Sequence, residues 1–267
     1  MAFSMSDIHK GIKKMPRKVI IYGPPKMGKS TLAGSTKNAL MIPTEDRVAH
    51  IDCDKTPVIK EFSEIFEIFD FLLEGKHNYK RLIIDSLDWL EPLLHKYLCD
   101  KNGYKTLSDD SNKETNYGKG LKYVAVGGWK TVLHNCDVLR DAGMDVIIVA
   151  HDTVITVTPP DMDNYDKAVM KIDKNALSVI EEWADIIAYY SKEIFTTEQK
   201  AGAKSQKKAV TSNKRILHLS GESPAMINGN SFGLPNAEVD IDCCSDIMEW
   251  MLTENKNKKL QTKTKGE

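Results

Sequence analysis

Nine residues near the amino end have the types and spacing of a loop that binds phosphate. They fit the pattern G-x-x-x-x-G-K-[ST] and read Gly23-Pro24-Pro25-Lys26-Met27-Gly28-Lys29-Ser30-Thr31. The two glycines let the backbone curve so that main-chain N–H groups converge on an anion. In such a loop Lys29 neutralises the β- and γ-phosphates, and the Ser30 hydroxyl binds Mg²⁺. The segment predicts a site for a nucleoside triphosphate with Mg²⁺; ATP is the expected nucleotide, and GTP stays open because no motif here reveals the base.

A predicted strand and a predicted helix flank this loop, as such a site needs. The apolar run Val19-Ile20-Ile21-Tyr22 is typical of a buried strand. Thr31 is expected to begin a helix with Leu32 and Ala33 on its inward side. The alternative, a chance glycine-rich turn, explains neither neighbour. The second lysine of the loop, Lys26, is expected to be solvated.

A carboxylate follows another apolar run and is a candidate metal ligand. Arg81-Leu82-Ile83-Ile84 is typical of a buried strand, and it ends in Asp85. In phosphate-loop enzymes an aspartate at this place holds Mg²⁺ beside the loop serine, usually through water. We therefore predict a metal site at Asp85 and Ser30. Asp88 is a competing carboxylate, but we expect it to cap the following helix or to face solvent.

A histidine follows a third apolar run, residues 145–150. Ligands of open α/β sheets lie at the carboxyl ends of the strands, so His151 can reach a γ-phosphate from there. The alternative is a histidine that merely ends a strand and bonds locally. The next segment, residues 152–174, is rich in β-branched and then acidic residues, and it predicts a hairpin or a mobile loop that leaves the sheet.

Two apolar stripes at helical spacing are expected to form core. They comprise Phe62, Ile65, Phe66, Phe69, Leu72 and Leu73, and then Trp129, Val132, Leu133, Cys136 and Leu139. A chain of 267 residues with 41% hydrophobic content can bury one sizeable core. We expect one main domain at residues 18–252, a surface leader at 1–17 and a flexible lysine-rich tail at 253–267.

The composition limits the classes of protein to which the chain can belong. The formal net charge is −1, so any nucleic-acid surface must be a local patch. The five cysteines form no C-x-x-C pair, which is typical of reduced thiols. No stretch has the length of a membrane span, and residues 1–15 lack the apolar run of a signal peptide. The chain is expected to be cytoplasmic, without a membrane partner.

Two polar segments are candidates for a nucleic-acid patch. Residues 199–215 carry six cations and predict an exposed basic hairpin tip or a disordered loop, with a solvated linker as the alternative. Residues 99–123 predict a long surface excursion whose tyrosines can stack on bases. The cations are Lys200, Lys204, Lys207, Lys208, Lys214 and Arg215, and the tyrosines are Tyr104, Tyr117 and Tyr123.

Several motifs together resemble one family. Besides the phosphate loop they are Thr44-Glu45 after the apolar run 39–42, Ile83-Ile84-Asp85-Ser86, Val149-Ala150-His151 and Trp183-Ala184-Asp185. Over residues 18–252 the set is similar to the RecA-like nucleotide-binding proteins of bacteriophages, an AAA-type P-loop family that includes single-strand annealing and recombination proteins related to RecA and RadA. The resemblance implies an α/β fold, a RecA-like P-loop NTPase core with a mostly parallel central sheet flanked by helices. In it, the strand of His151 separates the loop strand from the strand of Asp85.

The resemblance also implies catalytic roles. Glu45 would orient the attacking water, Lys29 would stabilise charge on the phosphate, and His151 would sense the γ-phosphate. In RecA relatives the loop after His151 contacts single-stranded DNA, but the acidic run Asp161, Asp163 and Asp166 does not suit phosphates.

The implied function is an ATP-hydrolysing phage protein of recombination or single-strand annealing, slow or stimulated by DNA. It would bind single-stranded DNA, assemble as a ring or filament, and work with other phage replication or recombination proteins in the host cytoplasm. Lys214 or Arg215 would reach the γ-phosphate of a neighbouring subunit.

Two other functions stay open. One is a nucleotide-switched binding module, such as a helicase-loading partner. The other is a small-molecule or nucleotide kinase, which needs clustered arginines to clamp two phosphate groups. The chain has five arginines, and they are not clustered in the sequence: Arg17, Arg47, Arg81, Arg140 and Arg215.

Overall fold

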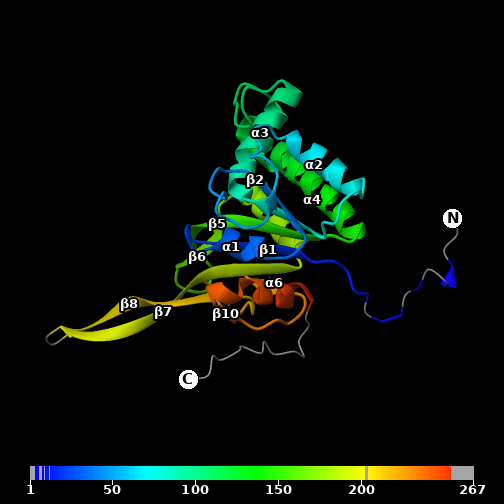
Figure 1. Ribbon diagram of the computed structural model, residues 1–267. Helices are drawn as coiled ribbons and strands as arrows, with labels where there is room; N and C mark the ends of the chain where they lie inside the picture. The colour runs from blue at the N-terminus through cyan, green and yellow to red at the C-terminus, as the bar shows by residue number, and fades with distance from the viewer. Residues whose placement is uncertain (1–3, 6–7, 9, 12, 202–203, 254–267) are drawn as a thin grey trace.

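A mixed β-sheet forms the centre of the computed structural model, which describes residues 4–5, 8, 10–11, 13–201 and 204–253, with the backbone alone at 194–201, 204–211 and 241 (Figure 1). The strands lie in the order β10-β8-β7-β1-β5-β4-β2-β3, with β6 beside β5 and β9 beside β7. They are β1 Lys18–Gly23, β2 Ala39–Pro43, β3 Asp54–Lys55, β4 Arg81–Asp85, β5 Asp145–Val157, β6 Tyr165–Met170, β7 Ile186–Ala201, β8 Lys204–His218, β9 Gly229–Asn230 and β10 Ala237–Val239.

The middle of the sheet is parallel, which confirms the predicted fold class. β3, β2, β4, β5, β1 and β7 run in one direction, and β8 returns antiparallel to β7. β5 lies between β1 and β4, so the strand of His151 separates the loop strand from the strand of Asp85, as the resemblance implies. The carboxyl ends of these strands meet at one edge of the sheet. There Gly23 is in register with His151, and Pro43 with Asp85.

Helices cover both faces of the sheet. Successive strand residues point to opposite faces, so Ile20 and Tyr22 pack into one layer while Val19 and Ile21 pack into the other. The first layer contains α2 to α5, and the second contains α1 and α6 (Figure 1). The helices are α1 Lys29–Gly34, α2 Glu64–Leu73, α3 Leu87–Asn102, α4 Val126–Asp141, α5 Lys174–Trp183 and α6 Cys244–Thr253, with short 3-10 helices at Asn116–Gly118 and Ile241–Cys243 and a π-helical turn at Gly120–Ala125.

The two apolar stripes form core as predicted, apart from one residue. The α4 stripe is wholly buried, and most of the earlier stripe is buried with it. Phe66 packs partly buried against that core, but Leu73, the last residue of α2, is 38% exposed. α1 begins at Lys29 and not at Thr31, with its inward residues buried as expected.

The segment 99–123 is less of a surface loop than predicted. α3 continues to Asn102, and Leu107 and Thr115 are buried. A Cβ on Gly120 would collide with the Leu107 backbone, so this glycine allows the segment to fold onto the body. Two of the predicted stacking residues, Tyr117 and Tyr123, are exposed.

Two hairpins extend from the sheet, one formed by β5 and β6 and the other by β7 and β8. β5 pairs with β6 from Asp152 to Val157, so the segment after His151 is a hairpin, one of the two predicted forms. β7 and β8 continue beyond the body as a two-stranded arm, so the basic segment is also a hairpin (Figure 1). The side chains of Lys200, Lys204, Lys207 and Lys208 lie outside the described residues.

Arg17, the last residue of the predicted leader, belongs to the core. Its guanidinium lies 3.7 Å from the ring centre of Phe232, and it donates to the Met251 carbonyl at 2.7 Å. The predicted flexible tail beyond Thr253 lies outside the described residues. Among the helices that the structure describes, none has the length and apolar content needed to cross a membrane.

Candidate nucleotide site

The phosphate loop curves at the end of β1, as its glycines predict. Gly28 has φ +91°, a left-handed conformation that side chains other than glycine rarely adopt. Gly23 lies so close to the backbone of Tyr190 that a Cβ there would collide with it. Both predicted glycines are therefore required by the loop itself, one by conformation and the other by close approach. Lys26, between them, is exposed as predicted.

Lys29 is buried at the centre of the loop. Its Nζ donates to the carbonyls of Gly23 and Pro24 at 2.8 and 2.9 Å. An ammonium group has three N–H donors, so this arrangement leaves one for a phosphate oxygen. Burial lowers the pKa of Lys29, although nearby carboxylates, Asp152 first and then Asp85, favour its charged form.

Asp85 fits the role of a metal ligand. Its side chain is 1% exposed, and Oδ2 has no hydrogen-bond partner among the described residues. Burial raises the pKa of Asp85, while a hydrogen bond from the Ser30 hydroxyl lowers it. An unpartnered carboxylate oxygen beside a serine hydroxyl suits a hard cation such as Mg²⁺. No group of three acidic, histidine or cysteine ligands occurs in the described part of the chain, so this cation would need the phosphates as further ligands.

Thr44 holds Glu45 beside Asp85. The Thr44 N–H donates to the Asp85 carbonyl at 2.7 Å. Its hydroxyl accepts from the Ser86 N–H at 2.7 Å and donates to the Ser86 carbonyl at 3.0 Å. These bonds join the ends of β2 and β4, so Glu45 faces the same cavity as Asp85 and Lys29. The sequence marked Thr44 as part of a motif but gave no sign of this positioning role.

Glu45 itself forms an ion pair at the rim of the site. Its Oε2 lies 3.6 Å from Nε of Arg47, whose side chain is 76% exposed while that of Glu45 is 13% exposed. An exposed pair of this kind contributes little stability. The pair with Arg47 therefore adds little to the position of Glu45, which follows from the bonds made by Thr44.

Asp88 was expected to cap its helix or face solvent, and this prediction is wrong. Its side chain is 5% exposed, and its carboxylate accepts from the His151 N–H at 3.0 Å and contacts His151 Nδ1 at 3.0 and 3.1 Å. The first turn of α3 packs against β5, so Asp88 faces that strand. Burial raises the pKa of Asp88, but the hydrogen bonds from His151 outweigh burial and lower it. With Nδ1 assigned to Asp88, Nε2 is the ring nitrogen that faces a ligand.

The strand of His151 also continues further than predicted. β5 does not end there but runs to Val157, because its second half pairs with β6. His151 is the last residue in register with β1, so it still lies at the carboxyl edge of the parallel sheet.

Replacing Asp88 with alanine is expected to lower the free energy of unfolding by about 1 to 3 kcal/mol, because His151 loses a charged acceptor for two of its N–H groups. Urea denaturation measures the change. Asp100→Ala, at an exposed position of the same helix, is the control and is expected to change stability by less than about 0.5 kcal/mol. Equal losses in both variants would show that the Asp88–His151 contact contributes nothing.

The predicted site residues, apart from Gly23 and Pro24 at the start of the loop, line one cavity of about 480 Å³. It brings together Lys29, Ser30, Glu45, Asp85 and His151. Five lining residues had no predicted role in this site: Arg47, His50, Val149, Arg215 and Cys244. Arg47 and Arg215 therefore line the same cavity, although they lie far apart in the sequence.

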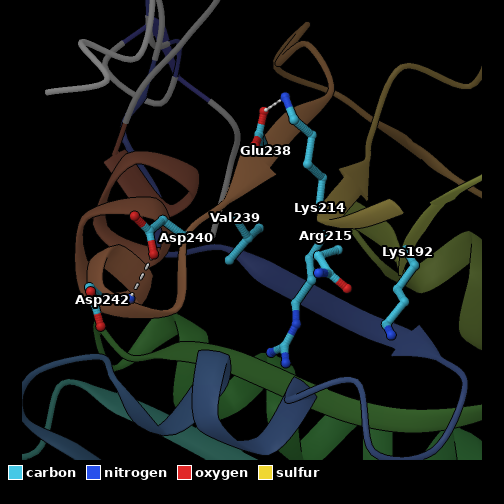
Figure 2. Close-up of a pocket in the computed structure, with 8 residues that line it drawn as sticks. Lys192, Lys214, Arg215, Glu238, Val239, Asp240 and Asp242 are labelled. Carbon is cyan, nitrogen blue, oxygen red and sulfur yellow. Dashed lines mark hydrogen bonds and ion pairs between the residues drawn. The ribbon is translucent and has the colours of Figure 1, made fainter. Parts of the chain in front are cut away.

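The two cations proposed to reach a neighbouring subunit have different surroundings within this chain. Figure 2 shows Lys214 and Arg215 pointing to opposite sides of β8. Lys214 pairs with Glu238 at 3.0 Å, whereas Arg215 extends toward α1 and lines the cavity of its own chain.

Comparisons with known proteins give one family match and distant similarities to solved structures. Residues 15–224 match a family model described as an AAA domain. No curated protein matches the chain. One similar solved structure is the KaiC-like protein PH0186 from Pyrococcus horikoshii OT3, at 12% identity and a TM-score of 0.37, covering 76% of this chain and 85% of that one. Another is the flagellar accessory protein FlaH from Methanocaldococcus jannaschii, at 12% identity and a TM-score of 0.37, covering 85% and 91%.

Proposed function

Because the chain belongs to the AAA domain family, we propose that it binds and hydrolyses ATP with Mg²⁺ and acts on single-stranded DNA as a recombination or annealing protein of the phage type. The observation that carries the ATPase part is the buried, unpartnered Asp85 Oδ2 in one cavity with Lys29, Ser30 and Glu45. The DNA part is supported by the family resemblance and by the lysine-bearing arm.

Each residue of the cavity has its own role in the proposed hydrolysis. The loop amides and Lys29 bind the phosphates, and Ser30 and Asp85 would hold Mg²⁺. When bound, Mg²⁺ neutralises charge on the phosphate oxygens. Glu45 orients water for attack on the γ-phosphate and accepts its proton. His151, fixed by Asp88, presents Nε2 to the γ-phosphate.

The deciding experiment is ATP turnover by the purified chain with and without single-stranded DNA. We expect phosphate release that rises when DNA is added. Turnover indifferent to DNA would contradict the recombination function and favour a nucleotide-switched binding module.

A kinase is a second candidate because Arg47 and Arg215 both line the cavity. Arginines placed together can clamp the phosphates of a donor and an acceptor. The same assay separates the two functions. An ATPase releases phosphate without any acceptor molecule, whereas a kinase needs one.

The arm gives a testable salt dependence. Replacing Lys204, Lys207 and Lys208 with alanine is expected to reduce the slope of log affinity for single-stranded DNA against log salt by about 2, because each cation that neutralises a phosphate contributes about 0.7. Fluorescence anisotropy at several salt concentrations measures it. A variant with the same net charge, changed at the exposed Lys60, Lys76 and Lys130, is the control.

An unchanged slope in the arm variant would exclude the arm as the DNA contact. A reduced slope in both variants would indicate a non-specific effect of net charge.

A further inference from the structure

Arg215 enters the nucleotide cavity of its own chain from a different element than the loop. It lies on β8, in register with Val239 of β10 and Lys192 of β7. A Cβ built on Gly28 would lie 2.8 Å from Nη1 of Arg215, so the guanidinium rests against the phosphate loop. It lines the cavity together with Lys29 and Asp85.

The surroundings of this guanidinium suit an anionic ligand. In the part of the chain that the structure describes, no carboxylate lies within ion-pairing distance of Arg215. The buried hydroxyl of Tyr190, on the neighbouring strand, lies beside it, and Arg215 opposes the rise in the pKa of Tyr190 that burial causes. A planar cation with several N–H donors and no acidic partner is well suited to phosphate oxygens.

The regular pairing of β7 with β8 is interrupted directly next to Arg215. Lys192 pairs with Arg215, but the next recorded pair is Ile194 with Thr211, so residues 212–214 of β8 lie opposite Glu193 alone. Extra residues of this kind bend a strand and re-aim its side chains. Ser212 Oγ donates to Glu193 Oε2 at 2.9 Å within this bulge. The cavity and the arm are therefore joined through one short bent segment.

We infer that Arg215 binds the phosphate chain of a nucleoside triphosphate held by its own subunit, and that this contact links nucleotide occupancy to the base of the β7–β8 arm. The inference rests on the proposed function, because it places the triphosphate in this cavity. A phosphate oxygen that accepts from the guanidinium restrains β8 at the bulge, and the restraint passes to the strands that carry the arm.

The first test is nucleotide binding by Arg215→Ala, measured by calorimetry at a concentration where centrifugation shows a monomer. ATP is expected to bind about 10- to 100-fold more weakly, the usual effect of losing hydrogen bonds to a charged group. Lys192→Ala is the matched control, because this cation lies opposite Arg215 across the ladder but does not line the nucleotide cavity. It is expected to bind ATP within about twofold of the unchanged chain.

Arg215→Lys tests whether a loss of affinity comes from misfolding, since it keeps the positive charge but removes the guanidinium group. It is expected to bind ATP with intermediate affinity. Equal affinity of the Arg215→Ala variant and the unchanged chain overturns the inference. A loss that appears only where the protein self-associates also overturns it, because the arginine would then serve a neighbour.

The second test is hydrogen exchange of the backbone amides of residues 211–216. Saturating ATP is expected to slow their exchange in the unchanged chain but not in Arg215→Ala. Exchange slowed equally in both overturns the link to the arm. If the unchanged chain binds no purine triphosphate, the proposed function fails and the inference fails with it. If the chain binds ATP and Arg215→Ala binds it equally well, only the inference fails.

Discussion

Replacement of Lys29 by alanine is expected to weaken ATP binding by at least about 100-fold. The Lys29 ammonium is buried in the loop, and two of its donors hold the loop carbonyls of Gly23 and Pro24. Its loss removes a charge-assisted contact to the phosphates, worth about 3 kcal/mol, and also the two hydrogen bonds that hold the loop in shape. Calorimetric titration with ATP and Mg²⁺ measures the change.

Lys37→Ala is the matched control for this variant. Lys37 is an exposed lysine just beyond the end of α1, and its replacement is expected to leave ATP affinity unchanged. Circular dichroism shows whether each variant is folded. Tight ATP binding by a folded Lys29→Ala protein would mean that the triphosphate binds elsewhere, and the proposed site would be wrong.

Replacement of Glu45 by glutamine is expected to lower ATP turnover by about 100- to 10,000-fold while ATP affinity stays within about threefold. Glutamine keeps the shape of the side chain but cannot accept a proton from water, which is the contribution of a general base. The Thr44 bonds to Asp85 and Ser86 are made by other groups, so the position of the side chain is retained. Phosphate release and calorimetry together separate the two quantities.

Asp46→Asn supplies the comparison, since this neighbouring carboxylate is exposed and does not line the cavity. It is expected to hydrolyse ATP at the rate of the unchanged chain. Turnover by Glu45→Gln at that same rate would assign the general base to another residue.

The local parts of the site could be predicted from the sequence because each is encoded by adjacent residues. An apolar run followed by glycines or by Asp85 specifies both a buried strand and the group at its end, and the run before His151 specifies the buried part of β5. The order of the strands is set by contacts between distant segments, and only the family resemblance indicated that β5 lies between β1 and β4.

Asp88 and Arg215 show why the rest was not predictable. A residue in the first turn of a helix faces solvent or core according to how that helix packs, and only the contact of α3 with β5 turns Asp88 toward His151. Arg215 belongs to a segment whose composition reads as an exposed basic loop. Its approach to Gly28 depends on pairing among β8, β7 and β10, which no local pattern reports.

The three bonds made by Thr44 have a mechanical consequence for turnover. Moving the backbone before Glu45 away from the end of β4 would require breaking all of them, at about 1 kcal/mol each. The joined ends of β2 and β4, which carry Glu45 and Asp85, are therefore expected to keep their relative position through the reaction. A conformational change that depends on the nucleotide is therefore expected at the side of the cavity lined by Arg215, next to the bulge of β8.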